Sequence, residues 1–137
     1  MTDRQIDCGP FIPNVSSSVT GQTVHFGSTE DLEAAFHSHG EKIAAFVIET
    51  VEGNAGTVVP PKGYLQAVRQ LCTQYNVLFI ADEIQCGLGR TGYFMAYDAE
   101  EVKPDLVVLG KALTGGAYSM GMLVGSRETI GLYKPGQ

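Results

Sequence analysis

Three ionisable side chains stand where a parallel sheet would bring them together. Each follows a short, continuous run of apolar residues, and the three are Glu49, Asp82 and Lys111. Because ligands bind beyond the carboxyl ends of parallel strands, we expect these side chains to line one site. Any one of them alone would pass for an ordinary polar strand end, whereas three that converge favour a functional site.

A glycine motif and an acidic strand suggest nucleotide binding, but neither has the right surroundings. Residues 87–92 match Gly-x-Gly-x-x-Gly, which in a dinucleotide-binding fold directly follows a strand and opens a helix. Here residues 83–86 intervene and no helix-start signal follows, so we interpret the glycines as a turn that reverses the chain. Residues 77–83 resemble the acidic strand of a nucleotide triphosphatase, but the phosphate-binding loop that must accompany it is absent.

Metal and thiol chemistry are also poorly supported. His37 and His39 are two residues apart, so they do not face each other on a helix, and we expect no metal site. Cys86 has no histidine nearby in the sequence to activate it, which favours a small packing residue. The three cysteines, Cys8, Cys72 and Cys86, are odd in number and far apart. This pattern predicts a reducing, cytoplasmic compartment without a disulfide framework.

The composition limits the partners of the chain. Its 137 residues fit one domain, and a net charge of −6 without a basic run argues against nucleic acid or an anionic membrane surface. No apolar stretch is long enough to span a bilayer, and residues 1–10 resemble neither a signal peptide nor a transit peptide. We therefore expect small molecules as the main partners.

Lys111 and Asp82 together suit the chemistry of pyridoxal 5'-phosphate. This cofactor needs a lysine amine that bonds to it covalently and moves a proton, and a carboxylate that keeps its pyridine nitrogen protonated. An aspartate at a buried strand end holds one geometry, whereas a lysine on a glycine-flanked turn can move. The glycines beside Lys111 would leave room for the cofactor ring.

Alternating helices and apolar strands must position these residues. A cap at Ser28 and a stop at Gly40 predict one helix, and an apolar stripe over residues 65–75 predicts a second. Continuous apolar runs predict strands buried on both faces, at residues 44–48, 77–81, 105–109 and 122–124. The sequence therefore predicts an α/β fold with a mostly parallel sheet and flanking helices, preceded by a loop over residues 1–22.

Residues 79–92, followed by Lys111, resemble the signature of class III aminotransferases, which are fold type I enzymes that depend on pyridoxal 5'-phosphate. Within that class the chain is most similar to the ornithine-type members. The supporting segments are residues 9–14, 64–66, 78–85, 103–105 and 109–113. The similarity runs from about Gly9 to Gly136, which implies that residues 1–137 form a single partial domain, the central part of a large domain.

The resemblance implies a role for each of five residues. It matches Lys111 with the lysine that carries the cofactor, Asp82 with the partner of the pyridine nitrogen, and Gln85 with the residue that hydrogen-bonds the ring hydroxyl. It matches Ile84 with the side chain packed on one ring face, and Glu49 with a glutamate near cofactor and substrate. The implied reaction moves the δ-amino group of ornithine to 2-oxoglutarate, giving glutamate 5-semialdehyde and glutamate, a step of proline biosynthesis. The family form implied is a homodimer.

Two departures from the family pattern leave the function open. Residues 49–54 read Glu-Thr-Val-Glu-Gly-Asn where the family usually has Glu-Pro-x-Gln-Gly-Glu, so Asn54 replaces a glutamate that pairs with a gating arginine. The chain also lacks counterparts of the family's phosphate loop, ring-stacking aromatic and carboxylate-binding arginine. One hypothesis is an ornithine-type aminotransferase, active in a longer form or completed by another chain. The other is a truncated, inactive remnant or assembly partner.

Overall fold

Four strands form one sheet in the order of the sequence. The computed structural model describes residues 23–132, so the loop predicted for residues 1–22, which includes Cys8, lies outside the described residues. The strands are β1 (Ala45–Glu49), β2 (Leu78–Asp82), β3 (Leu106–Leu109) and β4 (Met122–Gly125). β1, β2 and β3 run parallel, and β4 pairs antiparallel with β3. The predicted strands and the mostly parallel sheet are confirmed, with strand ends correct to within one residue.

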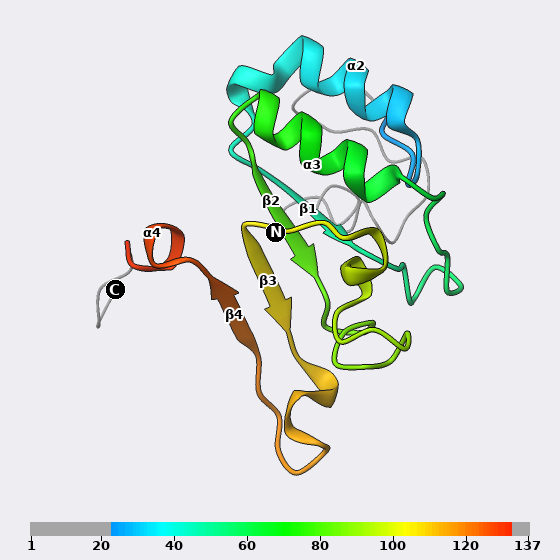
Figure 1. Ribbon diagram of the computed structural model, residues 1–137, viewed down its shortest axis with the longest axis vertical. Coiled ribbons are helices and arrows are strands. Elements are labelled where there is room, and N and C mark those ends of the chain that lie inside the picture. Colours follow the sequence, from blue (N-terminus) through cyan, green and yellow to red (C-terminus); the bar gives the residue numbers. More distant parts are fainter. Residues whose placement is uncertain (1–22, 133–137) are drawn as a thin grey trace.

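The first long helix, α2 (Thr29–His39), begins and ends where the sequence predicts. The hydroxyl oxygen of Ser28 accepts the backbone N–H of Asp31 at 3.2 Å, which satisfies a free donor at the start of the helix. Beyond Gly40 the chain continues as a short 3-10 helix, η2 (Gly40–Lys42), before β1. Figure 1 shows α2 beside the second long helix, and the two pack against each other.

That second helix, α3 (Tyr64–Gln74), follows Gly63, whose φ of 88° lies in the left-handed region that glycine favours. A carboxylate remote in the sequence caps the N-terminus of this helix. Glu100 accepts the backbone N–H groups of Gly63 at 3.0 Å and Leu65 at 3.1 Å. The predicted apolar stripe is the buried face of this helix, which includes Leu65, Val68 and Cys72.

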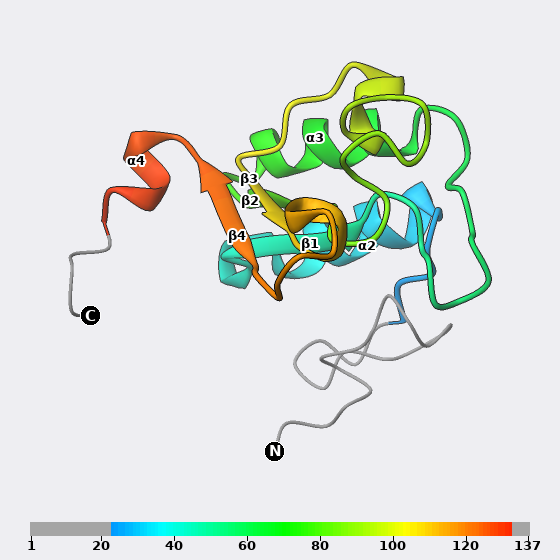
Figure 2. The same cartoon turned by 90° about the horizontal axis from the view of Figure 1, so that it is seen from below.

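Short helices connect the remaining elements. They are η3 (Ala96–Glu100), η4 (Lys111–Thr114) and α4 (Arg127–Ile130). Figure 2 shows α4 at the margin of the molecule, and in Figure 1 both β4 and α4 lie away from α2 and α3. No helix within residues 23–132 is long and apolar enough to cross a membrane.

The main core joins both long helices to one face of the sheet. Its buried residues are Leu32, Phe36, Ile48, Tyr64, Leu65, Val68, Cys72, Val77, Phe79 and Ala81. On the other face Val47 is 51% exposed and Leu78 is 38% exposed. The prediction that the strands are buried on both faces is therefore wrong, because α2 and α3 pack on the same face.

Candidate cofactor site

The carboxyl ends of three parallel strands bring the predicted ionisable residues together. These strand ends form one edge of the sheet. Glu49 and Asp82 are the last residues of β1 and β2 and are paired in the register of the sheet. Lys111 follows the last residue of the neighbouring strand β3 after Gly110. In Figure 1 the arrowheads of these three strands point the same way. The prediction that Asp82 and Lys111 lie at one end of the sheet is confirmed.

Lys111 has an unusual backbone conformation. Its φ is 45°, in the left-handed region that residues with a side chain rarely adopt. Residues held in such conformations cluster at functional sites. The side chain of Lys111 is exposed, and its Nζ donates a hydrogen bond to Oε1 of Gln85. The amine is therefore both accessible and directed toward the end of β2.

The turn after β2 holds the other predicted residues beside the sheet edge. Oδ1 of Asp82 accepts the backbone N–H of Ile84 at 3.0 Å, which fixes the carboxylate. Ile84 lies against Gly110, where an added Cβ would come within 3.3 Å of its Cγ2. Gln85 lies against Gly53, where an added Cβ would come within 2.2 Å of its Nε2. Two glycines therefore make room for these two side chains.

Glu49 is only 4% exposed and accepts the backbone N–H of Gly53 at 2.9 Å. Burial raises the pKa of Glu49, while the bond from Gly53 lowers it. The charge of Asp82 further raises this pKa and the charge of Lys111 lowers it, so both groups lie within electrostatic reach of Glu49. Glu52 is also buried, and its pKa is raised by burial and then by the charge of Glu49.

These residues fit the cofactor that the sequence suggests. Pyridoxal 5'-phosphate has an aldehyde that bonds to an accessible amine and a ring nitrogen that pairs with a carboxylate. Lys111 provides an exposed amine held by an amide, and Asp82 provides a half-buried carboxylate from the adjacent strand. Gly110, directly before Lys111, adds no side chain next to Ile84.

The remaining sequence candidates have other roles. The backbone N–H of Gly89 donates to the carbonyl of Phe94 at 3.1 Å, and the next helix starts only at Ala96. The glycine motif is therefore the chain-reversing turn that we predicted. Cys86 is buried and burial raises the pKa of its thiol, as expected for a packing residue. Residues 23–132 contain no group of three or more histidine, cysteine, aspartate or glutamate side chains that could hold a metal ion.

Two polar residues behind the site had no role assigned from the sequence. Glu83 and Thr50 are both buried, and the Thr50 hydroxyl donates to Oε1 of Glu83 at 2.5 Å. They are 33 residues apart, and no local pattern signals such a pair. The only available signal was that Glu83 adjoins Asp82.

Comparison with known proteins identifies the family. The family model for class III aminotransferases matches residues 3–137, so the chain belongs to this family. It is 46% identical to mitochondrial ornithine aminotransferase of Arabidopsis thaliana over 129 residues, which cover 94% of this chain and 26% of the relative. It is 42% identical to ornithine aminotransferase of Saccharomyces cerevisiae over 137 residues, covering 98% of this chain and 32% of the relative.

Solved structures confirm the fold. Ornithine delta-aminotransferase of Plasmodium falciparum is 41% identical with a TM-score of 0.79, over 83% of this chain and 28% of that chain. Acetylornithine aminotransferase of Elizabethkingia anophelis is 40% identical with a TM-score of 0.80, over 83% of this chain and 28% of that chain. The sheet and helices described above are therefore a part of the aminotransferase fold, and the chain spans less than a third of the length of these structures.

Proposed function

We propose that the protein is an ornithine-type aminotransferase that uses pyridoxal 5'-phosphate to move the δ-amino group of ornithine to 2-oxoglutarate. The observation that carries this proposal is the shared sheet edge, where Nζ of Lys111 donates to Gln85 beside the end of the strand that carries Asp82. Because the chain spans 26% of the Arabidopsis relative, residues 1–137 would form a single partial domain, the central part of a large domain.

Each predicted residue has one task in this proposal. Bound pyridoxal 5'-phosphate supplies an electron-accepting ring that makes a proton on the substrate carbon acidic. Lys111 holds the cofactor through Nζ and moves that proton, while Asp82 keeps a proton on the ring nitrogen. Gln85 orients the ring through its hydroxyl, and Ile84 offers an apolar contact to one ring face. Glu49 contributes to the substrate side.

The choice of amino donor depends on the surroundings of Glu49. Asn54 is exposed and stands where the family pattern usually has a glutamate. The chain resembles an ornithine and an acetylornithine aminotransferase at similar identity. We propose ornithine as the donor and a small 2-oxo acid as the acceptor, in a homodimer without nucleic acid or membrane as a partner. A cytoplasmic location and a place in proline biosynthesis stay predictions, and the Arabidopsis relative is named as mitochondrial.

An assay of the protein translated from the complete reading frame that contains this chain tests the proposal. Ornithine and 2-oxoglutarate should give glutamate 5-semialdehyde and glutamate, and the product should be lost in Lys111→Ala. Product formation from acetylornithine but not from ornithine would retain the aminotransferase and replace the donor. If no amino donor gives a product, the proposal that the protein is an aminotransferase is refuted.

A truncated, inactive remnant or assembly partner is the second candidate. The observation that favours it is the share of the relatives that the chain covers, between 26% and 32% for the two curated examples. A phosphate needs a cluster of backbone N–H groups, such as a helix N-terminus, to hold it, and Ser28 and Glu100 already accept such groups at the starts of α2 and α3. If the neighbouring reading frame lacks the remaining parts, the remnant is the better account.

A further inference from the structure

Glu83 is a buried carboxylate beside the site that the proposed chemistry does not use. It is 1% exposed, and a carboxylate removed from water is costly unless hydrogen bonds compensate. The hydroxyl of Thr50 donates to it at 2.5 Å, and the backbone N–H groups of Ala96 and Tyr97 donate at 2.9 and 3.2 Å. Each of these partners is at least 13 residues away in the sequence.

The contacts of Glu83 reach all three strand ends that carry the proposed site. Its bond with Thr50 ties it to the residue that directly follows β1. It directly follows Asp82, the last residue of β2, and its own backbone N–H donates to the carbonyl of Val108 in β3 at 2.9 Å. Because side chains alternate along an extended chain, Glu83 points to the buried side while Asp82 points away from it.

Glu83 also closes the glycine turn behind the site. Its bonds to Ala96 and Tyr97 hold the start of η3, where the chain returns from that turn. An added Cβ at Gly87 would lie 2.8 Å from the carbonyl oxygen of Glu83, so the turn leaves the strand in close contact with this residue. Sγ of Cys86 lies 3.6 Å from the same carboxylate.

We infer that Glu83 is a positioning residue, whose carboxylate holds the end of β1 and the start of η3 against the end of β2, beside the strand that leads to Lys111. The inference rests on the proposed function and adds to it the residue that sets the geometry. Glu83 directly follows Asp82 and stands two residues before Gln85. Its backbone N–H bonds to β3, the strand that leads to Lys111. Loss of its carboxylate should therefore change where the cofactor reacts, beyond any general loss of stability.

Reductive trapping measures this effect directly. The complete protein is mixed with pyridoxal 5'-phosphate and reduced with borohydride, and peptide mapping gives the label on Lys111 relative to the exposed Lys103. Glu83→Gln and the milder Thr50→Val are compared with Thr50→Ser, which keeps the hydroxyl. Glu100→Gln is the matched control, because Glu100 also accepts backbone N–H groups but holds the start of α3. All variants are measured where circular dichroism shows them folded.

We expect the label ratio to fall about tenfold in Glu83→Gln, because small misplacements of reacting groups have large effects on rate. Thr50→Val should show a smaller fall, while Thr50→Ser and Glu100→Gln should keep the wild-type ratio. Cys86 should react faster with a thiol reagent in Glu83→Gln. An unchanged ratio in Glu83→Gln, or an equal fall in Glu100→Gln, would overturn this inference alone. A wild-type protein without any preference for Lys111 would instead refute the proposed function.

Discussion

Gln85 shows how the single residues of the site depend on one another. Its amide oxygen accepts the bond from Lys111, while its amide nitrogen occupies the space that a side chain at Gly53 would need. Gly53 does not have a positive φ. The close contact, and not the backbone conformation, is therefore the reason for glycine at this position.

Gly53→Ala should disturb the site more than the fold. The new Cβ would lie 2.2 Å from Nε2 of Gln85, at the end of a flexible side chain that can move aside at little cost. The moved amide would release Lys111, so we expect the affinity for pyridoxal 5'-phosphate to fall about tenfold, measured by absorbance titration. Gly121→Ala is the control, because its Cβ would meet only an ordinary contact at 3.8 Å. Equal affinities in both variants would contradict the account.

Glu52 gives a test of the electrostatics at this sheet edge. Burial and then the charge of Glu49 raise its pKa. A carboxyl with a raised pKa in the folded state contributes stability that is fully present below its unfolded pKa and is lost as the pH rises through the folded pKa. Glu52→Gln should therefore raise the urea midpoint at about pH 7 and change it little at about pH 4. The same change at both pH values would show that the pKa of Glu52 is not raised.

Residue types at strand ends were enough to predict that Lys111 and Asp82 lie at one end of the sheet, because a parallel sheet brings its carboxyl ends together whatever the detailed packing. The contacts of Glu83 were not predictable in this way. It depends on bonds to Thr50 and to the backbone of Ala96, both remote in the sequence. Backbone donors in particular leave no trace in the residue type.

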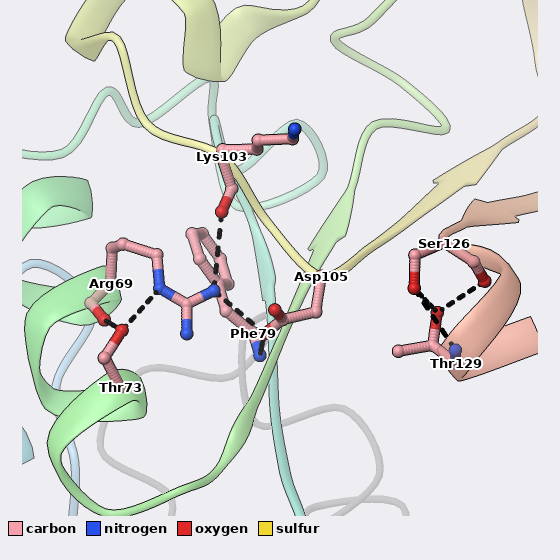
Figure 3. Close-up of polar contacts among 7 residues, drawn as sticks. All are labelled: Arg69, Thr73, Phe79, Lys103, Asp105, Ser126 and Thr129. Atoms are coloured by element: carbon pink, nitrogen blue, oxygen red, sulfur yellow. Dashed lines mark hydrogen bonds and ion pairs between the residues drawn. The ribbon is translucent and has the colours of Figure 1, made fainter.

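At the scale of the elements, one carboxylate joins β2, β3 and α3 at the opposite edge of the sheet, which the amino ends of the parallel strands form. Oδ2 of Asp105 accepts the backbone N–H of Phe79 at 2.7 Å and a bond from Nη1 of Arg69 at 2.8 Å, as Figure 3 shows. The guanidinium of Arg69 also lies 5.7 Å from the centre of the Phe79 ring. These contacts align the starts of the strands whose ends carry the proposed site.

Asp105→Ala should cost about 2 kcal/mol of unfolding free energy, because it leaves the backbone N–H of Phe79 without its acceptor and removes the ion pair of the half-buried Arg69. Asp105→Asn keeps an acceptor oxygen and should cost less. Thr73→Ala removes only an exposed hydroxyl that accepts from Nε of Arg69 at 3.1 Å, so it serves as the control. Urea unfolding measures all three variants, and a loss in Asp105→Ala no larger than in Thr73→Ala would show that Asp105 does not stabilise this part of the sheet.

The elements themselves were predictable because their signals are local. Ser28 capped α2 as expected, and apolar runs located the four strands within residues 23–132 to within one residue. The burial of the sheet was not predictable, because an apolar run does not say which segment covers it. Val47 is exposed since both long helices pack on the other side of β1.

At the scale of the whole molecule, the uncovered face of the sheet should govern how the 137-residue chain behaves alone. Val47 and Leu78 are exposed on that face, and Leu123 is exposed on β4. Exposed apolar patches of this kind promote association. At micromolar concentration we expect the isolated chain either to self-associate, as measured by sedimentation, or to be only marginally stable, as measured by urea unfolding. A monomer that unfolds cooperatively under these conditions would contradict this expectation.

The isolated chain should also bind the cofactor weakly and show no measurable transamination. Catalysis needs the cofactor phosphate and the substrate carboxylate held in one pose, and we predict that the isolated chain grips neither of them. Turnover of ornithine with 2-oxoglutarate by the purified chain would refute this expectation and exclude the remnant.

The visible absorbance of pyridoxal 5'-phosphate titrated into the protein tests the central claim most directly. Lys111 is the amine that donates to Gln85 beside the strand end of Asp82, whereas Lys103 is an exposed lysine before β3. We predict that the absorbance change is lost in Lys111→Ala and kept in Lys103→Ala. An unchanged titration in Lys111→Ala would show that the cofactor reacts with lysines at random, and would remove Lys111 from its proposed role.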